Sequence, residues 1–258
     1  MRKSKSPLTD DLTRDAFLGG QLHLWQPRSG YRAGLDPVLL AAAVPAVSGQ
    51  SLLDLGCGAG AAMLCAATRV PGLMCTGIEL QDSYAALARR NAAEAGITAQ
   101  IHTADLRDLP LDIRQTQYDH VIMNPPYFER HRGATSSDPG RDTGRGGTTP
   151  LADWLETGIR RTAPRGTLTI IQQTARLHEI LAMLYGRLGS VIVQPLTPRP
   201  GRAPNLVMVQ AKLGGRAAFQ LAQPLILHVG AIHSHDGDDY TPAIRAILRH
   251  GEKLPLGG

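Results

Sequence analysis

Three glycines and two acids in the first half of the sequence have the types and spacing of a ligand-binding site. Gly56, Gly58 and Gly60 follow an apolar stretch that contains Asp54, and Glu79 ends the next apolar stretch. A glycine-rich turn between a strand and a helix lets the backbone approach a ligand and directs helix amide groups at it. A carboxylate at the end of the next strand can accept hydrogen bonds from both hydroxyls of a ribose. This pattern favours a ribosyl ligand over a turn that only packs a strand on a helix.

The tetrapeptide Asn124-Pro125-Pro126-Tyr127 follows another apolar stretch, residues 118–123. An amide oxygen and a proline-held carbonyl can both accept hydrogen bonds from one planar NH₂ group, while an aromatic ring stacks on the plane that carries it. Paired prolines also end strands for backbone reasons alone, which is the plainer interpretation. Because the tetrapeptide follows a ligand-binding turn, we interpret it as a pocket for an aromatic or amide amine.

Apolar and helical stretches alternate around both motifs and must position them. Periodicity predicts strands over residues 51–55, 74–80, 100–104 and 120–123, and helices over 61–70 and 83–95, the second ending at Gly96. Such alternation is typical of an α/β fold, with a parallel sheet, helices on both faces and ligands at the carboxyl ends of the strands.

The second half of the chain continues the alternation after a polar, glycine-rich stretch, residues 129–150, which we interpret as a long surface loop. Helices are predicted over 151–162 and 176–187, strands over 167–172, 191–194 and 206–211, a weaker strand over 225–229 and a terminal helix over 241–249. We expect the sheet to end as a β-meander edge. A length of 258 residues fits one α/β domain with elaborations.

The stretch from Asp54 to Gly60 departs from the Gly-x-Gly-x-x-Gly of NAD sites and resembles motif I of the class I S-adenosylmethionine-dependent methyltransferases. The resemblance implies a Rossmann-like, seven-stranded, mostly parallel sheet with helices on both faces. It implies a methyltransferase domain over residues 51–258 and an N-terminal segment, residues 1–50, packed on the cofactor site. It also implies that the glycine turn and Asp54 hold the amino-acid part of the cofactor, that Glu79 binds the ribose and that Asp105 lies near the adenine amine. The implied cofactor-binding residues are Asp54, Gly56, Gly58, Gly60, Glu79, Asp105 and Asn124.

The tetrapeptide resembles motif IV of methyltransferases that modify the exocyclic amine of adenine, N2 of guanine or the amide of glutamine. This implies that Asn124 Oδ1 and the Pro125 carbonyl accept hydrogen bonds from the target nitrogen, and that Tyr127, beside Pro126, stacks on the base. The methyl group then passes in line from sulfur to nitrogen. Proximity, alignment and stabilisation of the developing charge supply most of the acceleration, so neither Asp54 nor Asp105 is expected to be a general base.

The stretch 26–40 resembles the segment over the cofactor in the bacterial tRNA1(Val) (adenine-N6)-methyltransferase family, and 198–202 and 239–241 resemble C-terminal landmarks of related sequences. Glutamine methyltransferases usually carry a larger N-terminal domain, and DNA adenine methyltransferases a target-recognition domain. The resemblance therefore implies N6-methylation of adenine in tRNA. The same chemistry on guanine N2 of rRNA or on a protein glutamine, and a non-catalytic RNA-binding protein of this fold, stay open.

The charge of the chain favours a polyanionic partner. Its 27 basic and 22 acidic residues give a formal net charge of +5. Five bases and no acid lie between Glu179 and Asp236: Arg187, Arg199, Arg202, Lys212 and Arg216. Four arginines follow the tetrapeptide: Arg130, Arg132, Arg141 and Arg145. Clustered cations bind phosphates, and an enzyme extracts a base from its stack most easily in a single-stranded loop such as an anticodon loop. The alternative is that these basic residues form an ordinary solvated face. We assign Arg130, Arg132, Arg199 and Arg202 to substrate binding.

Other classes of protein are disfavoured by the sequence. The longest apolar run, residues 39–47, contains Pro45 and is shorter than a membrane span. The start of the chain does not resemble a signal peptide, and three cysteines lack the spacing of a zinc site or disulfide framework, so we expect a cytoplasmic protein. We expect no metal site, because the histidine-rich stretch 228–236 is more typical of a polar loop. Trp25 and Trp154 are interpreted as packing residues. The oligomeric state stays open.

Overall fold

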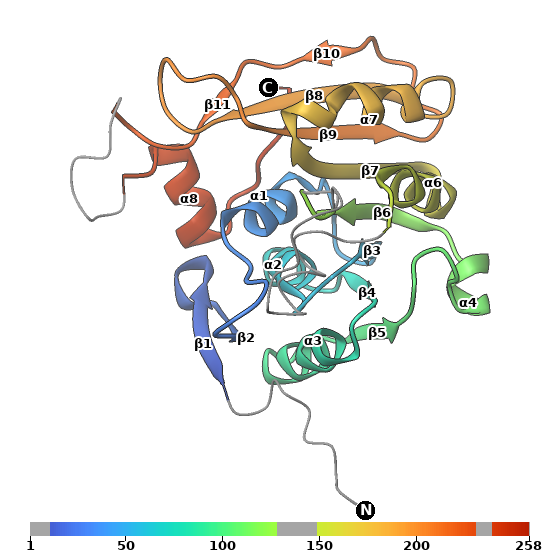
Figure 1. The fold of residues 1–258 in the computed structure, drawn as a ribbon, viewed down its shortest axis with the longest axis vertical. Helices are drawn as coiled ribbons and strands as arrows, with labels where there is room; N and C mark the ends of the chain where they lie inside the picture. Colours follow the sequence, from blue (N-terminus) through green and yellow to red (C-terminus); the bar gives the residue numbers. More distant parts are fainter. Residues whose placement is uncertain (1–10, 128–148, 231–238, 258) are drawn as a thin grey trace, which may run out of the picture.

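The computed structural model describes residues 11–127, 149–230 and 239–257, and folds them around one central sheet (Figure 1). Five parallel strands form its larger part: β3 (Ser51–Leu55), β4 (Met74–Glu79), β5 (Ala99–Thr103), β6 (Tyr118–Met123) and β7 (Thr162–Gln173). With β8 (Gly189–Thr197) and β9 (Leu206–Lys212) they make the seven predicted strands. Two short strands, β10 (Gln220–Leu221) and β11 (Leu225–Ile226), add to β8. The mostly parallel α/β fold is confirmed.

The β-meander prediction for the edge of the sheet is wrong. The strand order is β10-β8-β9-β7-β6-β3-β4-β5, so β9 lies between β7 and β8 and is antiparallel to both. The chain leaves β7 through a short 3-10 turn (Thr174–Arg176) and helix α7 (Leu177–Leu184), and crosses to β8. It then returns along β9. A helical crossover brings the next strand back parallel to the strand before it, which leaves a gap that β9 fills.

Helices cover both faces of the sheet because its buried strands are apolar on both sides. On one face, α1 (Leu35–Ala43), α2 (Ala61–Arg69) and α3 (Asp82–Glu94) share a core with Leu52 and Ile122. On the other, α4 (Leu111–Gln115), α6 (Leu151–Arg161) and α7 share a core with Leu53 and Val121. Neighbouring residues of one strand thus point into different cores, and the carboxyl ends of β3, β4, β5 and β6 stay open for a site.

The N-terminal part of the chain forms a hairpin that the sequence analysis did not predict. Strands β1 (Leu12–Phe17) and β2 (Leu22–Pro27) pair antiparallel around a short 3-10 turn (Leu18–Gly20). Helix α8 (Pro242–His250) packs on this turn and on α1 (Figure 1). The approach is close, since a Cβ at Gly19 would lie 2.3 Å from the Arg249 carbonyl oxygen. The N-terminal hairpin and the C-terminal helix α8 therefore meet beside α1, although the division of the chain at residue 50 stays a prediction.

Candidate active site

The glycine turn joins β3 to α2 in a conformation that favours glycine at three positions. Gly56, Gly58 and Gly60 have φ angles of 69°, 56° and 89°, which L side chains rarely adopt. The amides of Gly56 and Cys57 donate to the Ile78 carbonyl at 2.8 and 2.9 Å, and tie the turn to the end of β4. A Cβ on Gly56 would also lie 2.4 Å from a ring carbon of Trp154. The spacing seen in the sequence thus reflects both backbone conformation and close packing.

Glu79 ends β4 directly beside this turn. Its side chain is only 8% exposed, and its carboxylate accepts hydrogen bonds from the amides of Gly58 at 2.9 Å and Gln81 at 2.8 Å. Burial raises the pKa of Glu79, and these amides oppose that rise because they stabilise the ionised form. The geometry holds a carboxylate at the wall of the site, with lone pairs left to accept hydrogen bonds from a ligand.

Asp54 lies deeper, beneath the turn. It is 3% exposed, and its Oδ2 accepts a hydrogen bond from the Met63 amide, in the first turn of α2, at 3.2 Å. Burial raises the pKa of Asp54 to about 8, with the Met63 bond acting against the rise and the charge of Glu79 adding to it. Asp54 is not among the residues that line the cavity described below. Its contact in the structure is with the helix that carries the turn.

The pKa of Asp54 predicts a pH-dependent stability. Because the pKa is about 8 in the folded chain and ordinarily 3.8, the folded state keeps a proton that the unfolded chain releases between those values. The contribution of Asp54 to the stability of the folded state is therefore complete below about pH 4 and is lost as the pH rises to about 8. In urea unfolding, the free energy of unfolding of the wild type should therefore fall between pH 5 and pH 9. Asp54→Asn should make this fall smaller by a few kcal/mol.

A matched variant at the exposed Asp112, Asp112→Asn, should leave the wild-type pH profile unchanged. Parallel profiles for the wild type and Asp54→Asn would contradict the assignment of a raised pKa to this carboxyl group.

Asp105 follows β5 and lines the same cavity. Arg107 holds it closely: the Arg107 amide donates to Oδ1 at 2.9 Å, and the guanidinium reaches Oδ2 at 2.6 Å. These hydrogen bonds lower the pKa of Asp105, so the carboxyl group is ionised at neutral pH. The structure places the acid at the cavity wall, with a second residue, Arg107, fixing its direction.

The tetrapeptide lies at the end of β6 and is held from three directions. Asn124 Nδ2 donates to the Tyr31 hydroxyl at 3.5 Å. The Pro125 carbonyl accepts a hydrogen bond from Nε2 of Gln172, a fully buried residue of β7, at 3.4 Å. The Tyr127 hydroxyl donates to Asp36 Oδ2 at 2.5 Å. A planar amide and a tyrosine ring are therefore fixed at the carboxyl edge of the sheet.

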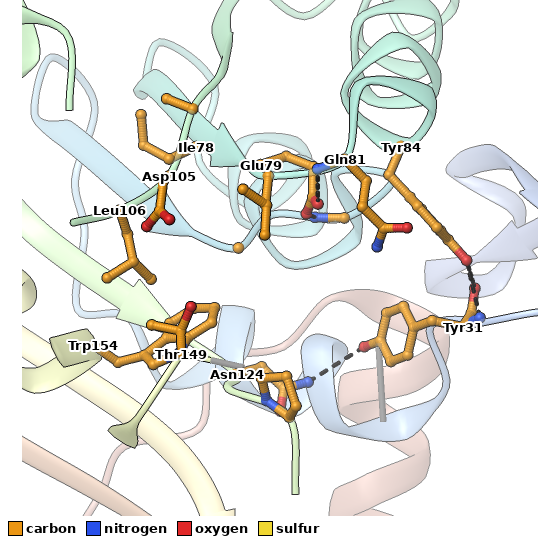
Figure 2. Close-up of a pocket in the computed structure, with 15 residues that line it drawn as sticks. Tyr31, Ile78, Glu79, Gln81, Tyr84, Asp105, Leu106, Asn124, Thr149 and Trp154 are labelled. Carbon is orange, nitrogen blue, oxygen red and sulfur yellow. Dashed lines mark hydrogen bonds between the residues drawn. The ribbon is translucent and has the colours of Figure 1, made fainter. Parts of the chain in front are cut away.

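One cavity connects the glycine turn to the tetrapeptide. Its empty space of about 810 Å³ includes the open solvent at its mouth. Figure 2 shows Glu79 and Gln81 on one side of it, Asn124 and Trp154 on the other, and Tyr31 beside Asn124. Its other lining residues include some from the glycine turn, the ends of β4 and β5, and the tetrapeptide: Gly56, Gly58, Ile78, Leu80, Tyr84, Ala104, Asp105, Leu106, Pro126 and Thr149. Parts of both motifs thus share one cavity, whereas Pro125 and Tyr127 are not among its lining residues.

Three aromatic residues of this cavity were not assigned to the site from the sequence. Trp154, interpreted as a packing residue, does belong to the core, and it also covers Gly56 and forms a wall of the cavity. Tyr31 and Tyr84 line it from the N-terminal segment and from α3. The stretch 26–40 was the only signal for Tyr31. Nothing in the sequence distinguishes Trp154 or Tyr84 from ordinary core residues.

Of the four arginines assigned to substrate binding, Arg199 and Arg202 are described by the structure, and neither lines this cavity. Arg130 and Arg132 lie outside the described residues. Arg199 is 14% exposed and pairs with Asp239, and its guanidinium also donates to the Val229 carbonyl at 2.7 Å. Arg202 is exposed on the loop between β8 and β9. Their roles in binding stay predictions, and for Arg199 the structure shows a contact within the chain that already uses the guanidinium.

The described part of the chain contains neither a candidate metal site nor a membrane-spanning helix. No group of three or more histidine, cysteine or acidic side chains there could hold a metal ion. His228 bonds to Asp239 at 2.6 Å, whereas His233, His235 and Asp236 lie outside the described residues. No helix among residues 11–127, 149–230 and 239–257 is long and apolar enough to cross a membrane.

Comparison with known proteins relates this chain to methyltransferases. The family model "Methyltransferase small domain" matches residues 34–138. The tRNA1(Val) (adenine(37)-N6)-methyltransferase of Aeromonas hydrophila is 30% identical over 224 residues, which cover 86% of this chain and 90% of that protein. The solved structure of a predicted O-methyltransferase from Agrobacterium tumefaciens superposes with a TM-score of 0.68 and 26% identity, covering 85% of this chain and 98% of the other.

A more distant structure shares the fold alone. The 16S rRNA N2 G1207 methyltransferase of T. thermophilus, solved with AdoMet and guanosine, superposes with a TM-score of 0.55 at 18% identity, covering 78% of this chain and 50% of that one.

Proposed function

Because the chain belongs to the tRNA1(Val) (adenine-N6)-methyltransferase family, we propose that it transfers a methyl group from S-adenosylmethionine to the exocyclic N6 amine of adenine in tRNA. The observation that carries this proposal is the cavity that joins the glycine turn and Glu79 to Asn124. One end suits a ribosyl cofactor, and the other suits a planar amine. The same proposal places the protein in the cytoplasm, where tRNA is found.

The cavity residues fit S-adenosylmethionine. A Cβ on Gly58 would meet only the Tyr31 ring, at 3.7 Å, so the turn leaves an open space that a larger residue would fill. Glu79 would accept hydrogen bonds from the ribose hydroxyls, Asp105 would bind near the adenine amine, and the glycine turn would hold the amino-acid part. When bound, the cofactor supplies a methyl group on a positively charged sulfur.

The chain's own groups then bind the target amine. Asn124 Oδ1 and the Pro125 carbonyl would each accept a hydrogen bond from one N–H of the amine, which would direct the nitrogen lone pair toward the methyl group and stabilise the positive charge that develops on nitrogen. After the methyl group has passed from sulfur to nitrogen, the nitrogen releases one proton to solvent. Tyr127, beside Pro126, stacks on the base and fixes its plane. Neither nearby aspartate is placed as a general base, because Asp54 lies beneath the turn and Asp105 is bonded to Arg107. Catalysis is by alignment and electrostatic stabilisation.

The proposed substrate can be separated from the alternatives by labelling. The purified protein would be incubated with S-adenosylmethionine labelled in the methyl group and, in parallel, with tRNA, with rRNA and with a protein fraction. Label in tRNA supports the proposal. Label in rRNA or in protein would show the same chemistry on another amine, and no label with retained cofactor binding would favour a non-catalytic RNA-binding protein.

We also propose that basic residues beside the tetrapeptide and on the β8–β9 side bind the tRNA backbone. Within the acid-free stretch, Arg187 pairs with Glu156 and Arg199 with Asp239. The other three bases form no ion pair with another described residue: Arg202, Lys212 and Arg216. The positive charge that the acid-free stretch offers to a phosphate backbone is therefore smaller than the sequence suggests. Arg130 and Arg132 stay candidates.

The KM for tRNA should depend steeply on salt if phosphate contacts dominate binding. Neutralising about three phosphates predicts a rise of roughly tenfold or more between 50 and 200 mM salt. The Kd of the cofactor, measured by calorimetry in the same buffers, should change less than about twofold. Equal salt dependence of the two constants would contradict a backbone-binding role for these residues.

A further inference from the structure

Two hydrogen bonds join the N-terminal segment to the tetrapeptide. Tyr31 Oη accepts a hydrogen bond from Asn124 Nδ2 at 3.5 Å, and Asp36 Oδ2 accepts one from Tyr127 Oη at 2.5 Å. The partners are separated by 93 and 91 positions in the sequence. The proposed function gives both tetrapeptide residues a direct role, since Asn124 binds the target amine and Tyr127 stacks on the base. The stretch Tyr31–Asp36, called the bracket below, therefore contacts the methyl-accepting half of the site twice.

The bracket is itself fixed to the rest of the fold. The Tyr84 hydroxyl accepts a hydrogen bond from the Tyr31 amide at 2.9 Å and donates to the Tyr31 carbonyl at 3.0 Å (Figure 2). The Ala33 amide donates to the side chain of Gln26, a buried residue of β2, at 2.7 Å. Asp36 lies in the first turn of α1, whose next seven residues are all buried. A group held by the bracket is thus held relative to the cofactor end of the cavity and to the core.

The Asp36–Tyr127 bond constrains the ring without covering its face. A phenol that donates to a carboxylate makes a charge-assisted hydrogen bond, which is stronger than a neutral one. Because the hydroxyl lies at the tip of the ring, the bond limits rotation and tilt of the ring and uses neither of its faces. The hydrogen bond from Tyr127 also lowers the pKa of Asp36 against the larger effect of burial.

The Tyr31–Asn124 bond acts on an amide that has two different ends. Only Oδ1 can accept a hydrogen bond from an amine, whereas Nδ2 would oppose it with hydrogens of its own. With Nδ2 directed at Tyr31, Oδ1 is the end left to accept. In the structure Tyr31 thereby holds the amide with Oδ1 free for the amine, although the hydroxyl alone could bond either end of an amide.

We propose that Asp36 and Tyr31 are positioning residues for methyl transfer, with Asp36 fixing the ring of Tyr127 and Tyr31 fixing the amide of Asn124. The proposal rests on the proposed function and deepens it, since it assigns part of the acceptor site to the N-terminal segment. Neither residue touches the transferred group. Their effect should appear in kcat, while the Kd of the cofactor stays the same for Asp36 variants.

A double-mutant cycle tests the Asp36–Tyr127 pair. Asp36→Ala and Tyr127→Phe each remove the hydrogen bond and keep an aromatic ring at position 127, so each should lower kcat about tenfold. The double variant should be no slower than the slower single variant, because both changes break the same bond. Asp36→Asn keeps an acceptor oxygen and should recover most of kcat. Asp112→Ala, which removes an exposed acid from the first turn of another helix, is the matched control.

The outcomes separate the inference from the function. The inference would be overturned if the losses in kcat of the two single variants multiply in the double variant, or if neither single variant changes kcat. The proposed function would still stand in either case, provided that the wild type transfers methyl groups. Equal losses in Asp36→Ala and Asp36→Asn would also overturn it. Tyr31→Phe should lower kcat by several-fold with the ring contact to the turn retained, and an unchanged kcat would remove Tyr31 from the proposal.

Fluorine NMR of protein labelled with 3-fluorotyrosine needs no turnover and tests the pair even if no substrate is methylated. The resonance that is lost in Tyr127→Phe should shift in Asp36→Ala and stay in place in Asp112→Ala. A resonance that does not move in Asp36→Ala would overturn the positioning of Tyr127 whether or not the proposed reaction is found.

Discussion

Asn124→Ala is expected to lower kcat for methyl transfer by about 100- to 1,000-fold, with a cofactor Kd within about threefold of the wild type. The loss follows from removing Oδ1, one of two acceptors proposed to stabilise the positive charge on the target nitrogen, and fixed electrostatic groups of this kind are worth about this much. The cofactor Kd is less affected because the residues proposed for ribose and adenine, Glu79 and Asp105, are untouched. Single-turnover rates and calorimetry measure the two quantities.

Asn124→Asp is the informative companion variant. It keeps an acceptor oxygen of the same size, so it should retain more activity than the alanine variant at neutral pH. If Asn124→Ala turns over at the wild-type rate, the acceptor role of the tetrapeptide is wrong. If instead both variants lose cofactor binding, the role of Asn124 lies in the cofactor site.

Glu79→Ala is expected to weaken cofactor binding by at least about 100-fold. Hydrogen bonds to a charged acceptor are worth about 1.5–3 kcal/mol each, and a ribose offers two hydroxyls. The change also leaves the Gly58 amide, which donates to this carboxylate at 2.9 Å, without that partner, so the turn itself is weakened. Because Glu79 does not contact the target amine in the proposed mechanism, kcat at saturating cofactor should fall far less than the affinity.

Glu79→Gln separates charge from shape at this position. It keeps one acceptor oxygen, so its cofactor Kd should lie between those of the wild type and the alanine variant. Glu252→Ala, an exposed acid near the C-terminus, serves as the control and should bind as the wild type does. A wild-type Kd for Glu79→Ala would contradict the assignment of this acid to the ribose.

The parts of the site that could be predicted from sequence are those set by local backbone geometry. The glycines of the turn have positive φ angles, and the tetrapeptide ends a strand, so both leave a pattern in consecutive residues. Helix and strand limits from 51 to 123 also agree closely with the structure, because apolar residues follow the period of each element.

The parts that could not be predicted depend on tertiary contacts. Trp154 contacts Gly56 from a helix almost 100 positions later in the sequence, and the Tyr84 hydroxyl bonds to the backbone of Tyr31. The edge of the sheet was predicted as a meander because periodicity gives strands but not their order. Charge counting along the sequence could not show that Arg187 and Arg199 pair with acids outside the acid-free stretch.

The central claim is that this site methylates the N6 amine of adenine in tRNA, and nucleoside mass spectrometry tests it most directly. A tRNA pool without the modification would be incubated with S-adenosylmethionine and either the wild type or Asn124→Ala, then digested to nucleosides. We expect N6-methyladenosine to accumulate with the wild type and not with the variant. Methylated guanosine in its place, or N6-methyladenosine formed equally by both proteins, would contradict it.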